Sequence, residues 1–102
     1  MNRKEILKRS KDIVCTERET EYGDVYENFK IIANFWSDYL GVVITEKDVS
    51  CMMSLLKIAR IKTGEPKLDN FVDAIGYLAL GGEICANSET QKTEQIEYAS
   101  DN

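Results

Sequence analysis

The sequence predicts an all-α fold, a compact four-helix bundle in which neighbouring helices run antiparallel. Apolar residues recur at three-and-four spacing over long segments, which is typical of helices that each bury one face. Short loops with glycine and a single proline separate these segments, and no alternating strand pattern appears. With 102 residues, 43% of them hydrophobic, the chain has enough apolar side chains for one core. We therefore expect one helical domain over residues 1–85 and a polar tail over residues 86–102.

The first two helices are separated by turn residues. The segment from Arg3 to about Glu19 consists of strong helix formers and predicts a short amphipathic helix. Gly23 then suits a turn with positive φ, and Asp24 suits the N-cap of a second helix that extends to Leu40. The apolar positions of this second helix form one thick aromatic face: Val25, Phe29, Ile32, Phe35, Trp36, Tyr39 and Leu40.

A third helix follows an extended link over residues 42–45. Gly41 ends the second helix, and Thr45 with Asp48 three residues later resembles a capping box with aspartate in the place of glutamate. The third helix is expected from about Glu46 to Ile61. Its predicted inner stripe comprises Val49, Met52, Leu55, Leu56 and Ala59.

The fourth helix carries two carboxylates in the most apolar segment of the chain. A glycine stop and the only proline, within residues 62–66, predict a break before it, and Gly81 and Gly82 are positions where it can end early. Between about residues 67 and 84, one broad apolar arc includes Leu68, Val72, Ile75, Ala79 and Leu80. Asp69 falls within this arc and Asp73 at its edge. Because an ionised carboxylate in an apolar interior needs compensation, we expect both to meet a positive partner. The polar residues after Cys85 predict a tail that is disordered or partly helical.

The composition excludes several classes of function. The chain has 13 basic and 18 acidic residues and a net charge of −5, which disfavours general nucleic-acid binding. Three widely spaced cysteines without any histidine indicate neither a disulfide framework nor a zinc site. No segment is apolar enough for a signal peptide or a membrane span. We therefore expect a cytoplasmic protein without a membrane partner.

The acidic residues on these helices have two interpretations. Carboxylates three or four apart share a helix face, and two such helices side by side can present oxygens to Mg²⁺, an ion that also holds nucleotide phosphates. The acids concerned are Asp24, Glu27, Asp48, Asp69 and Asp73. The alternative is structural: Lys57 and Arg60 neutralise Asp69 and Asp73, while the remaining aspartates cap helices.

Four further residues are candidates for substrate binding. Lys57 and Arg60 lie on one side of the third helix and suit either a substrate phosphate or the acids of the fourth helix. Asn28 borders the aromatic face of the second helix, where it can contact a base or ribose, or else satisfy a backbone group. Tyr77 can stack on a nucleobase, although an aromatic at helical spacing is more often part of the core.

Four segments together resemble a family of small uncharacterised phage and prophage proteins, which is in turn distantly similar to MazG-like, all-α nucleoside triphosphate pyrophosphohydrolases. The segments are EYGDVYENF (residues 21–29), ANFWSDYLG (33–41), DVSCMMSLLKIAR (48–60) and DNFVDAIGYLALGGE (69–83). The MazG-like resemblance implies Mg²⁺ held by two acidic pairs on two helices, with the metal activating water against a triphosphate. It also implies dimers or higher oligomers with sites between subunits.

The resemblance assigns roles to individual residues. Asp24 and Glu27 match the first acidic pair in spacing, and Asp73 matches the aspartate of the second pair. Asn70 occupies the other position of that pair, and Asp69 is offset from it by one residue. We therefore expect Asp24, Glu27, Asp69 and Asp73 as metal ligands, the last three as catalytic residues, and Lys57, Arg60, Asn28 and Tyr77 as substrate-binding residues.

The leading hypothesis for function is therefore a phage-type, MazG-like protein that binds nucleoside phosphates through Mg²⁺, with hydrolysis to a monophosphate and pyrophosphate as a further step. The alternative is a non-enzymatic counter-defence protein, either a sponge for nucleotide signals or an inhibitor of a host defence protein. Because Asn70 replaces one acid of the second metal-binding pair, the sequence leaves both hypotheses for function open.

Overall fold

The computed structural model describes residues 1–17, 24–64 and 67–100; at residues 16–17 and 89–100 it describes the backbone alone. The described residues form four α-helices and one π-helical turn, without a strand: α1 (Arg3–Asp12), η1 (Ile13–Glu17), α3 (Val25–Leu40), α4 (Glu46–Thr63) and α5 (Leu68–Ser100). The all-α prediction is confirmed. The predicted turn at Gly23 and the break at Pro66 lie outside the described residues.

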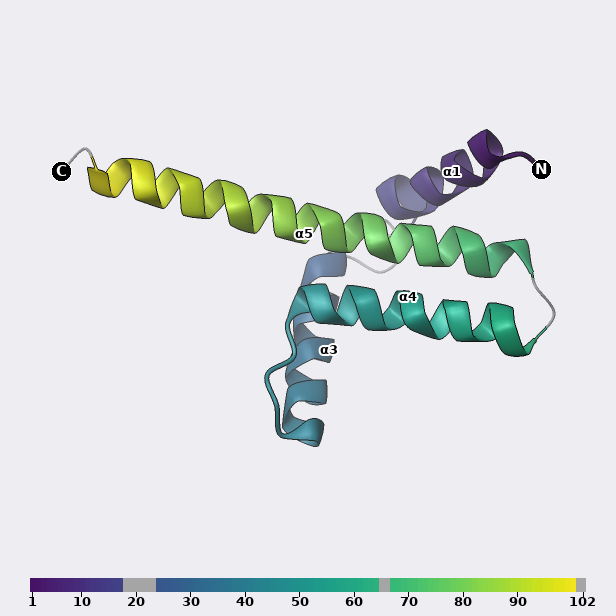
Figure 1. Ribbon diagram of the computed structural model, residues 1–102, viewed down its shortest axis with the longest axis horizontal. Helices are drawn as coiled ribbons and strands as arrows, with labels where there is room; N and C mark the ends of the chain where they lie inside the picture. Colours follow the sequence, from purple (N-terminus) through teal and green to yellow (C-terminus); the bar gives the residue numbers. More distant parts are fainter. Residues whose placement is uncertain (18–23, 65–66, 101–102) are drawn as a thin grey trace.

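The arrangement is more open than the predicted bundle. α4 and α5 lie side by side and antiparallel, α1 lies against the first half of α5, and α3 crosses the pair steeply (Figure 1). The prediction of antiparallel neighbours therefore holds for α4 and α5 but is wrong for α3. Gly81 and Gly82 do not end the last helix, which continues to Ser100. The long α5 makes the molecule elongated, 57 × 36 × 25 Å along its principal axes.

The ends of α3 follow the sequence pattern closely. Asp24 caps its start, because the carboxylate accepts a hydrogen bond from the Tyr26 backbone N–H at 2.9 Å. Gly41 ends it in the left-handed conformation, with φ of 70°, and its N–H donates to the Ser37 carbonyl. The Ser37 hydroxyl in turn accepts a hydrogen bond from the Ile44 backbone N–H at 2.8 Å. These contacts fix the sharp change of direction between α3 and α4.

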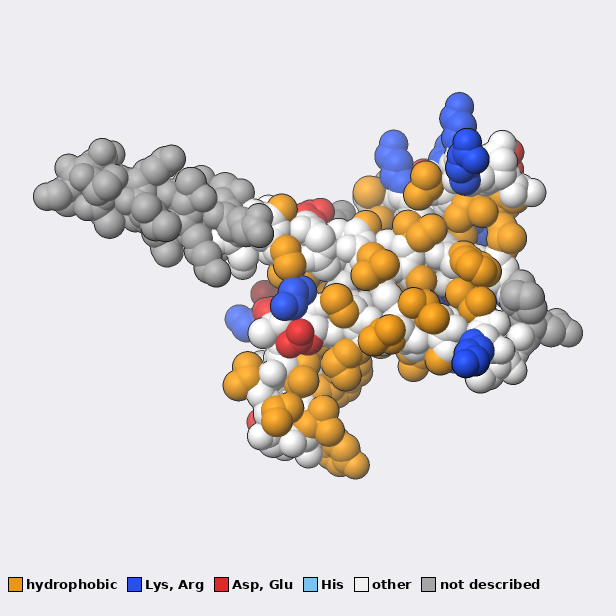
Figure 2. Space-filling view, viewed as in Figure 1, with side chains coloured by type: hydrophobic (Ala, Val, Ile, Leu, Met, Phe, Trp, Pro, Cys, Tyr) orange, Lys and Arg blue, Asp and Glu red, His pale blue; other side chains and the backbone are white. Residues whose placement is uncertain are grey.

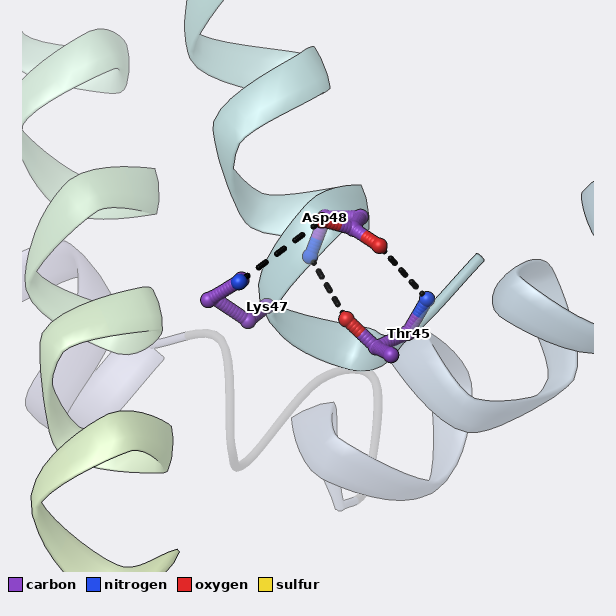
Figure 3. A network of polar contacts seen from close by, with 3 residues as sticks. All are labelled: Thr45, Lys47 and Asp48. Carbon is purple, nitrogen blue, oxygen red and sulfur yellow. Dashed lines mark hydrogen bonds and ion pairs between the residues drawn. The ribbon is translucent and has the colours of Figure 1, made fainter. Parts of the chain in front are cut away.

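The predicted capping box at the start of α4 is confirmed (Figure 3). The Asp48 backbone N–H donates to the Thr45 hydroxyl at 3.2 Å, and the Thr45 backbone N–H donates to the Asp48 carboxylate at 3.0 Å. The bond from the Thr45 backbone lowers the pKa of Asp48 below its ordinary value of 3.8. Lys47 lies 3.9 Å from the same carboxylate and assists more weakly.

Asp48 makes the stability of the protein depend on acid pH. Because its pKa is lower in the folded chain than in the unfolded chain, its contribution is present above about pH 4 and is lost as pH falls through the folded value. We expect Asp48→Ala to lower the urea midpoint at pH 7. Near pH 2 the midpoints of the variant and of the unsubstituted protein should be nearly equal. A difference between the two proteins that persists undiminished at pH 2 would contradict this role.

The hydrophobic core lies where α3 meets the α4–α5 pair. It is built from Val25, Phe29, Ala33, Val49, Tyr77 and Leu80, all nearly inaccessible to solvent. The Phe29 and Tyr77 rings pack at a tilt, with centroids 6.3 Å apart. The predicted aromatic face of α3 is therefore only partly buried: Trp36 packs against the core at its edge, whereas Phe35 and Tyr39 are exposed.

Small polar side chains form the contact between α4 and α5. The hydroxyls of Ser50 and Ser54 are buried and donate to the carbonyls of Tyr77 and Ala74 on α5, the second at 3.0 Å. The prediction for α4 is correct for Val49 but wrong for Met52, Leu55, Leu56 and Ala59, which are all exposed. α4 therefore turns its serines toward α5 and most of its apolar stripe away from it.

Candidate functional site

The four predicted metal ligands occupy separate places in the fold. Asp24 is the N-cap of α3, and Glu27 is exposed in the first turn of the same helix. Asp69 and Asp73 lie on α5 and each pairs with a cation from a different helix. Within the described residues, no group of three or more acidic, cysteine or histidine side chains is placed to hold a metal. The acidic residues that the structure describes therefore do not form a Mg²⁺ site within one chain, and the predicted site stays a prediction.

Asp69 does not face an apolar interior. Its carboxylate pairs with the Arg9 guanidinium of α1 at 2.8 Å, and 65% of its side chain is exposed. The expectation of an inward Asp69 is therefore wrong, because the residue lies in the first turn of α5, at the end of the helix pair, where the arc is open to solvent. The structural alternative expected Lys57 or Arg60 as the partner of Asp69, whereas the structure pairs Asp69 with Arg9.

Asp73 behaves as the structural alternative predicts. Its carboxylate lies 3.0 Å from the ammonium nitrogen of Lys57 on α4, and the two side chains are only 23% and 14% exposed. Shielding from water strengthens such a pair, although removing the charges from solvent offsets part of the gain. This ion pair joins α4 to α5 next to the contact that Ser54 makes with Ala74, since Asp73 precedes Ala74 and Lys57 follows Ser54 by three residues.

A cavity of about 330 Å³ lies at the corner between α3 and the α4–α5 pair. Its lining is mostly apolar and comprises Val25, Asn28, Phe29, Ile31, Ile32, Met53 and Tyr77. The volume falls at the lower end of the range for small-molecule sites, in which an apolar wall with few polar groups is usual. Two of the predicted substrate-binding residues, Asn28 and Tyr77, thus come together in one cavity from different helices.

The Lys57–Asp73 ion pair lies one helical turn from two residues of the cavity wall and does not itself line the cavity. Lys57 lies one helical turn beyond Met53 on α4, and Asp73 lies one turn before Tyr77 on α5. Because the helices are antiparallel, both steps lead in the same direction (Figure 1). The site therefore combines an apolar cavity with the Asn28 amide and, one turn away, the Lys57–Asp73 ion pair. Arg60 is exposed on α4 and does not line the cavity.

Sequence reasoning missed three of the polar groups that organise this region. Ser50 and Ser54 occur between apolar residues of α4, and nothing in their spacing indicates buried donors to α5. Arg9 belongs to a basic helix with several equivalent cations, so its pairing with Asp69 depends on how α1 packs against α5. The small residues of α5 opposite these serines offer a signal, since close helix contacts favour glycine and alanine.

Comparisons with known proteins give a family. The profile of a family described as a domain of unknown function (DUF6378) matches residues 5–85. Two proteins, each named Gene 55 protein, from Mycobacterium phage L5 and Mycobacterium phage D29, are 42% identical over 73 and 72 residues, in each case 71% of this chain. The chain spans about half the length of these curated relatives, 47% and 48%. No solved structure matches the chain. Over the part of the chain that the structure describes, no helix has both the length and the apolar character needed to traverse a membrane.

Proposed function

The chain belongs to the DUF6378 family, and we propose from its own geometry that the protein binds a nucleoside phosphate at the α3–α4–α5 corner. The observation that carries the proposal is the cavity itself, which brings Asn28 and Tyr77 together one helical turn from the Lys57–Asp73 pair. Its apolar wall suits a base, the Asn28 amide suits the polar edge of a base or sugar, and Lys57 suits a phosphate.

Binding is better supported than turnover. Hydrolysis of a triphosphate by a MazG-like mechanism requires several carboxylates around Mg²⁺, and the cavity wall contains none. The proposal therefore assigns Mg²⁺ no protein ligand within one chain. A protein that sequesters a nucleotide without cleaving it corresponds to the sponge form of the counter-defence hypothesis, and this is the role we favour over pyrophosphohydrolysis.

A panel of nucleoside mono-, di- and triphosphates, each with Mg²⁺ and with EDTA, tests both parts of the proposal. We expect at least one nucleotide at 1 mM to raise the melting temperature, because a ligand that binds the folded state stabilises it. We expect no pyrophosphate release from any triphosphate. Release that Asp73→Ala abolishes would instead favour the enzyme, and the absence of any thermal shift across the panel would contradict nucleotide binding.

A matched pair of variants on α3 locates the site. Asn28→Ala removes the amide that lines the cavity and is expected to weaken binding about 5- to 10-fold, the effect of one hydrogen bond to a ligand. Asn34→Ala is the control, because Asn34 is exposed on the same helix and does not line the cavity. Calorimetric titration measures both, and equal weakening by the two variants would place the ligand elsewhere.

A further inference from the structure

Helix α1 concentrates positive charge in an otherwise acidic protein. Residues 3–12 include five of the 13 basic residues of the chain and only two of its 18 acidic residues. The rest of the chain therefore has eight basic and 16 acidic residues. Figure 2 shows lysine and arginine side chains that project from α1 on the side turned away from α5, at the top of the view. The positive charge is thus gathered in one place on the surface.

Three lysines of α1 lie along its exposed side. Lys4, Lys8 and Lys11 are spaced by four and three residues, which places them on one side of the helix over a length of about 10 Å. All three are exposed, and none of them forms an ion pair with another described residue. We call these three residues the lysine stripe.

The contacts that fix α1 against α5 leave the lysine stripe unused. Ser10, on the other side of α1, is only 3% exposed. A β-carbon built on Gly76 of α5 would lie 2.9 Å from the Val14 side chain, so the end of this segment is in close contact with α5. Arg9 pairs with Asp69 at 2.8 Å and is therefore the basic residue that serves the fold. The lysine stripe is presented to solvent on a helix that is already held in place.

The lysine stripe does not stabilise α1 itself. Lys8 has a like charge one turn away on each side, at Lys4 and at Lys11, and such neighbours repel each other on a helix surface. Lys4 also lies in the first turn, where the helix dipole favours acidic side chains. Side chains that break these local rules are expected at functional sites, where their gain comes from a contact outside the fold.

We propose that the lysine stripe binds an acidic helical segment of another protein. Carboxylates spaced by four and three residues on such a segment match the three ammonium groups in spacing and in charge. Leu7 lies three residues after Lys4 and four before Lys11, so it borders the stripe, and it is 56% exposed. It offers the partner an apolar side chain to cover. The proposal does not depend on nucleotide binding at the α3–α4–α5 corner.

A protein segment fits the lysine stripe better than a nucleic acid or a membrane does. A nucleic acid needs several phosphate contacts, and beyond the short stripe it would extend over the acidic remainder of the molecule. A membrane-binding helix needs a broad exposed apolar face, whereas Ile6, Ile13 and Val14 are half-buried and only Leu7 of this segment's large aliphatic residues is exposed. A short acidic segment can contact α1 alone.

Fluorescence anisotropy with a labelled acidic peptide tests the proposal. The probe is a helical peptide whose glutamates are spaced by four and three residues, with one leucine beside them, and the full chain is added at low salt. We expect saturable binding that weakens as the salt concentration rises, and no binding of a peptide with glutamine in place of each glutamate. Lys8→Glu should raise the dissociation constant at least about tenfold, because it reverses the central charge of the stripe. Leu7→Ala should raise it about threefold, because less apolar area is covered.

Lys30→Glu is the matched control, because Lys30 is exposed on α3 and its replacement changes the net charge by the same amount. It should change the dissociation constant less than about twofold, and circular dichroism should show unchanged helicity in both charge variants. No binding of the acidic peptide at 1 mM, or equal weakening by Lys8→Glu and Lys30→Glu, would overturn the proposal. So would binding of a DNA duplex, or of vesicles of phosphatidylserine and phosphatidylcholine, that is tighter than binding of the peptide and is lost in Lys8→Glu.

Discussion

Gly81→Ala is expected to lower the free energy of unfolding by about 2 kcal/mol, because α4 and α5 approach each other too closely at this position for any side chain. A β-carbon built on Gly81 meets the Ser50 hydroxyl and lies 3.0 Å from the Ser50 β-carbon. Ser50 is fully buried and its hydroxyl is committed to the Tyr77 carbonyl, so it has no room to move aside. Urea unfolding at fixed protein concentration measures the change.

Gly82→Ala is the control for this prediction. A β-carbon on Gly82 has no neighbour within 4 Å, and alanine favours the helix over glycine. We therefore expect Gly82→Ala to raise the free energy of unfolding by about 0.5–1 kcal/mol, opposite in sign to the effect of its neighbour. Equal effects of the two substitutions would mean that the close contact at Ser50 is absent in solution.

Loss of the Lys57–Asp73 ion pair is expected to have an effect of similar size. Lys57→Met leaves the Asp73 carboxylate, which is only 23% exposed, without its partner, and should lower the free energy of unfolding by about 2 kcal/mol at pH 7. Combining it with Asp73→Asn removes both charges and should restore most of the loss. Urea unfolding of the four proteins of this double-mutant cycle yields the coupling between the two residues.

The same cycle separates a structural Asp73 from a catalytic one. If the single variants are destabilised and the double variant recovers, the ion pair holds α4 against α5 as the geometry indicates. Additive effects, with no recovery in the double variant, would show that the two residues act independently and would reopen the prediction that Asp73 serves a metal.

Local sequence signals predicted the ends of the helices well. Asp24, Gly41 and the Thr45–Asp48 box each act through atoms within a few residues of themselves, so their roles follow from spacing alone. The early end of the fourth helix that we considered at Gly81 and Gly82 does not occur, because tertiary contact decides those positions: Gly81 is required where α4 approaches, and the helix continues through both.

The direction in which each helix faces was harder to predict. The apolar stripe of α4 was assigned to the core, whereas the structure buries the adjacent serines and exposes Leu55 and Leu56. Periodicity identifies an apolar face but does not tell whether it packs within one chain or against another. The same limit applies to Asp69. Its side chain is exposed because it lies in the first turn of α5, and the apolar pattern of a helix does not show which part of that helix other helices cover.

The candidate site was predicted in part. Asn28 and Tyr77 were named as substrate-binding residues from separate helices, and they line one cavity because α3 crosses the α4–α5 pair next to both. The pairing of Lys57 with Asp73 was also anticipated as the structural alternative. Arg60 and the acids of α3 were included through spacing or resemblance. Arg60 is exposed on α4, and Asp24 and Glu27 are exposed at the start of α3, so none of the three lines the cavity.

Mapping of amide chemical shifts tests directly whether a nucleotide binds at the α3–α4–α5 corner. A ¹⁵N-labelled sample is titrated with the nucleotide that gives the largest thermal shift, and we expect the strongest changes at the cavity wall, around Asn28, Met53 and Tyr77. Changes concentrated on the basic helix α1, or spread evenly over the chain without a maximum at this corner, would contradict it.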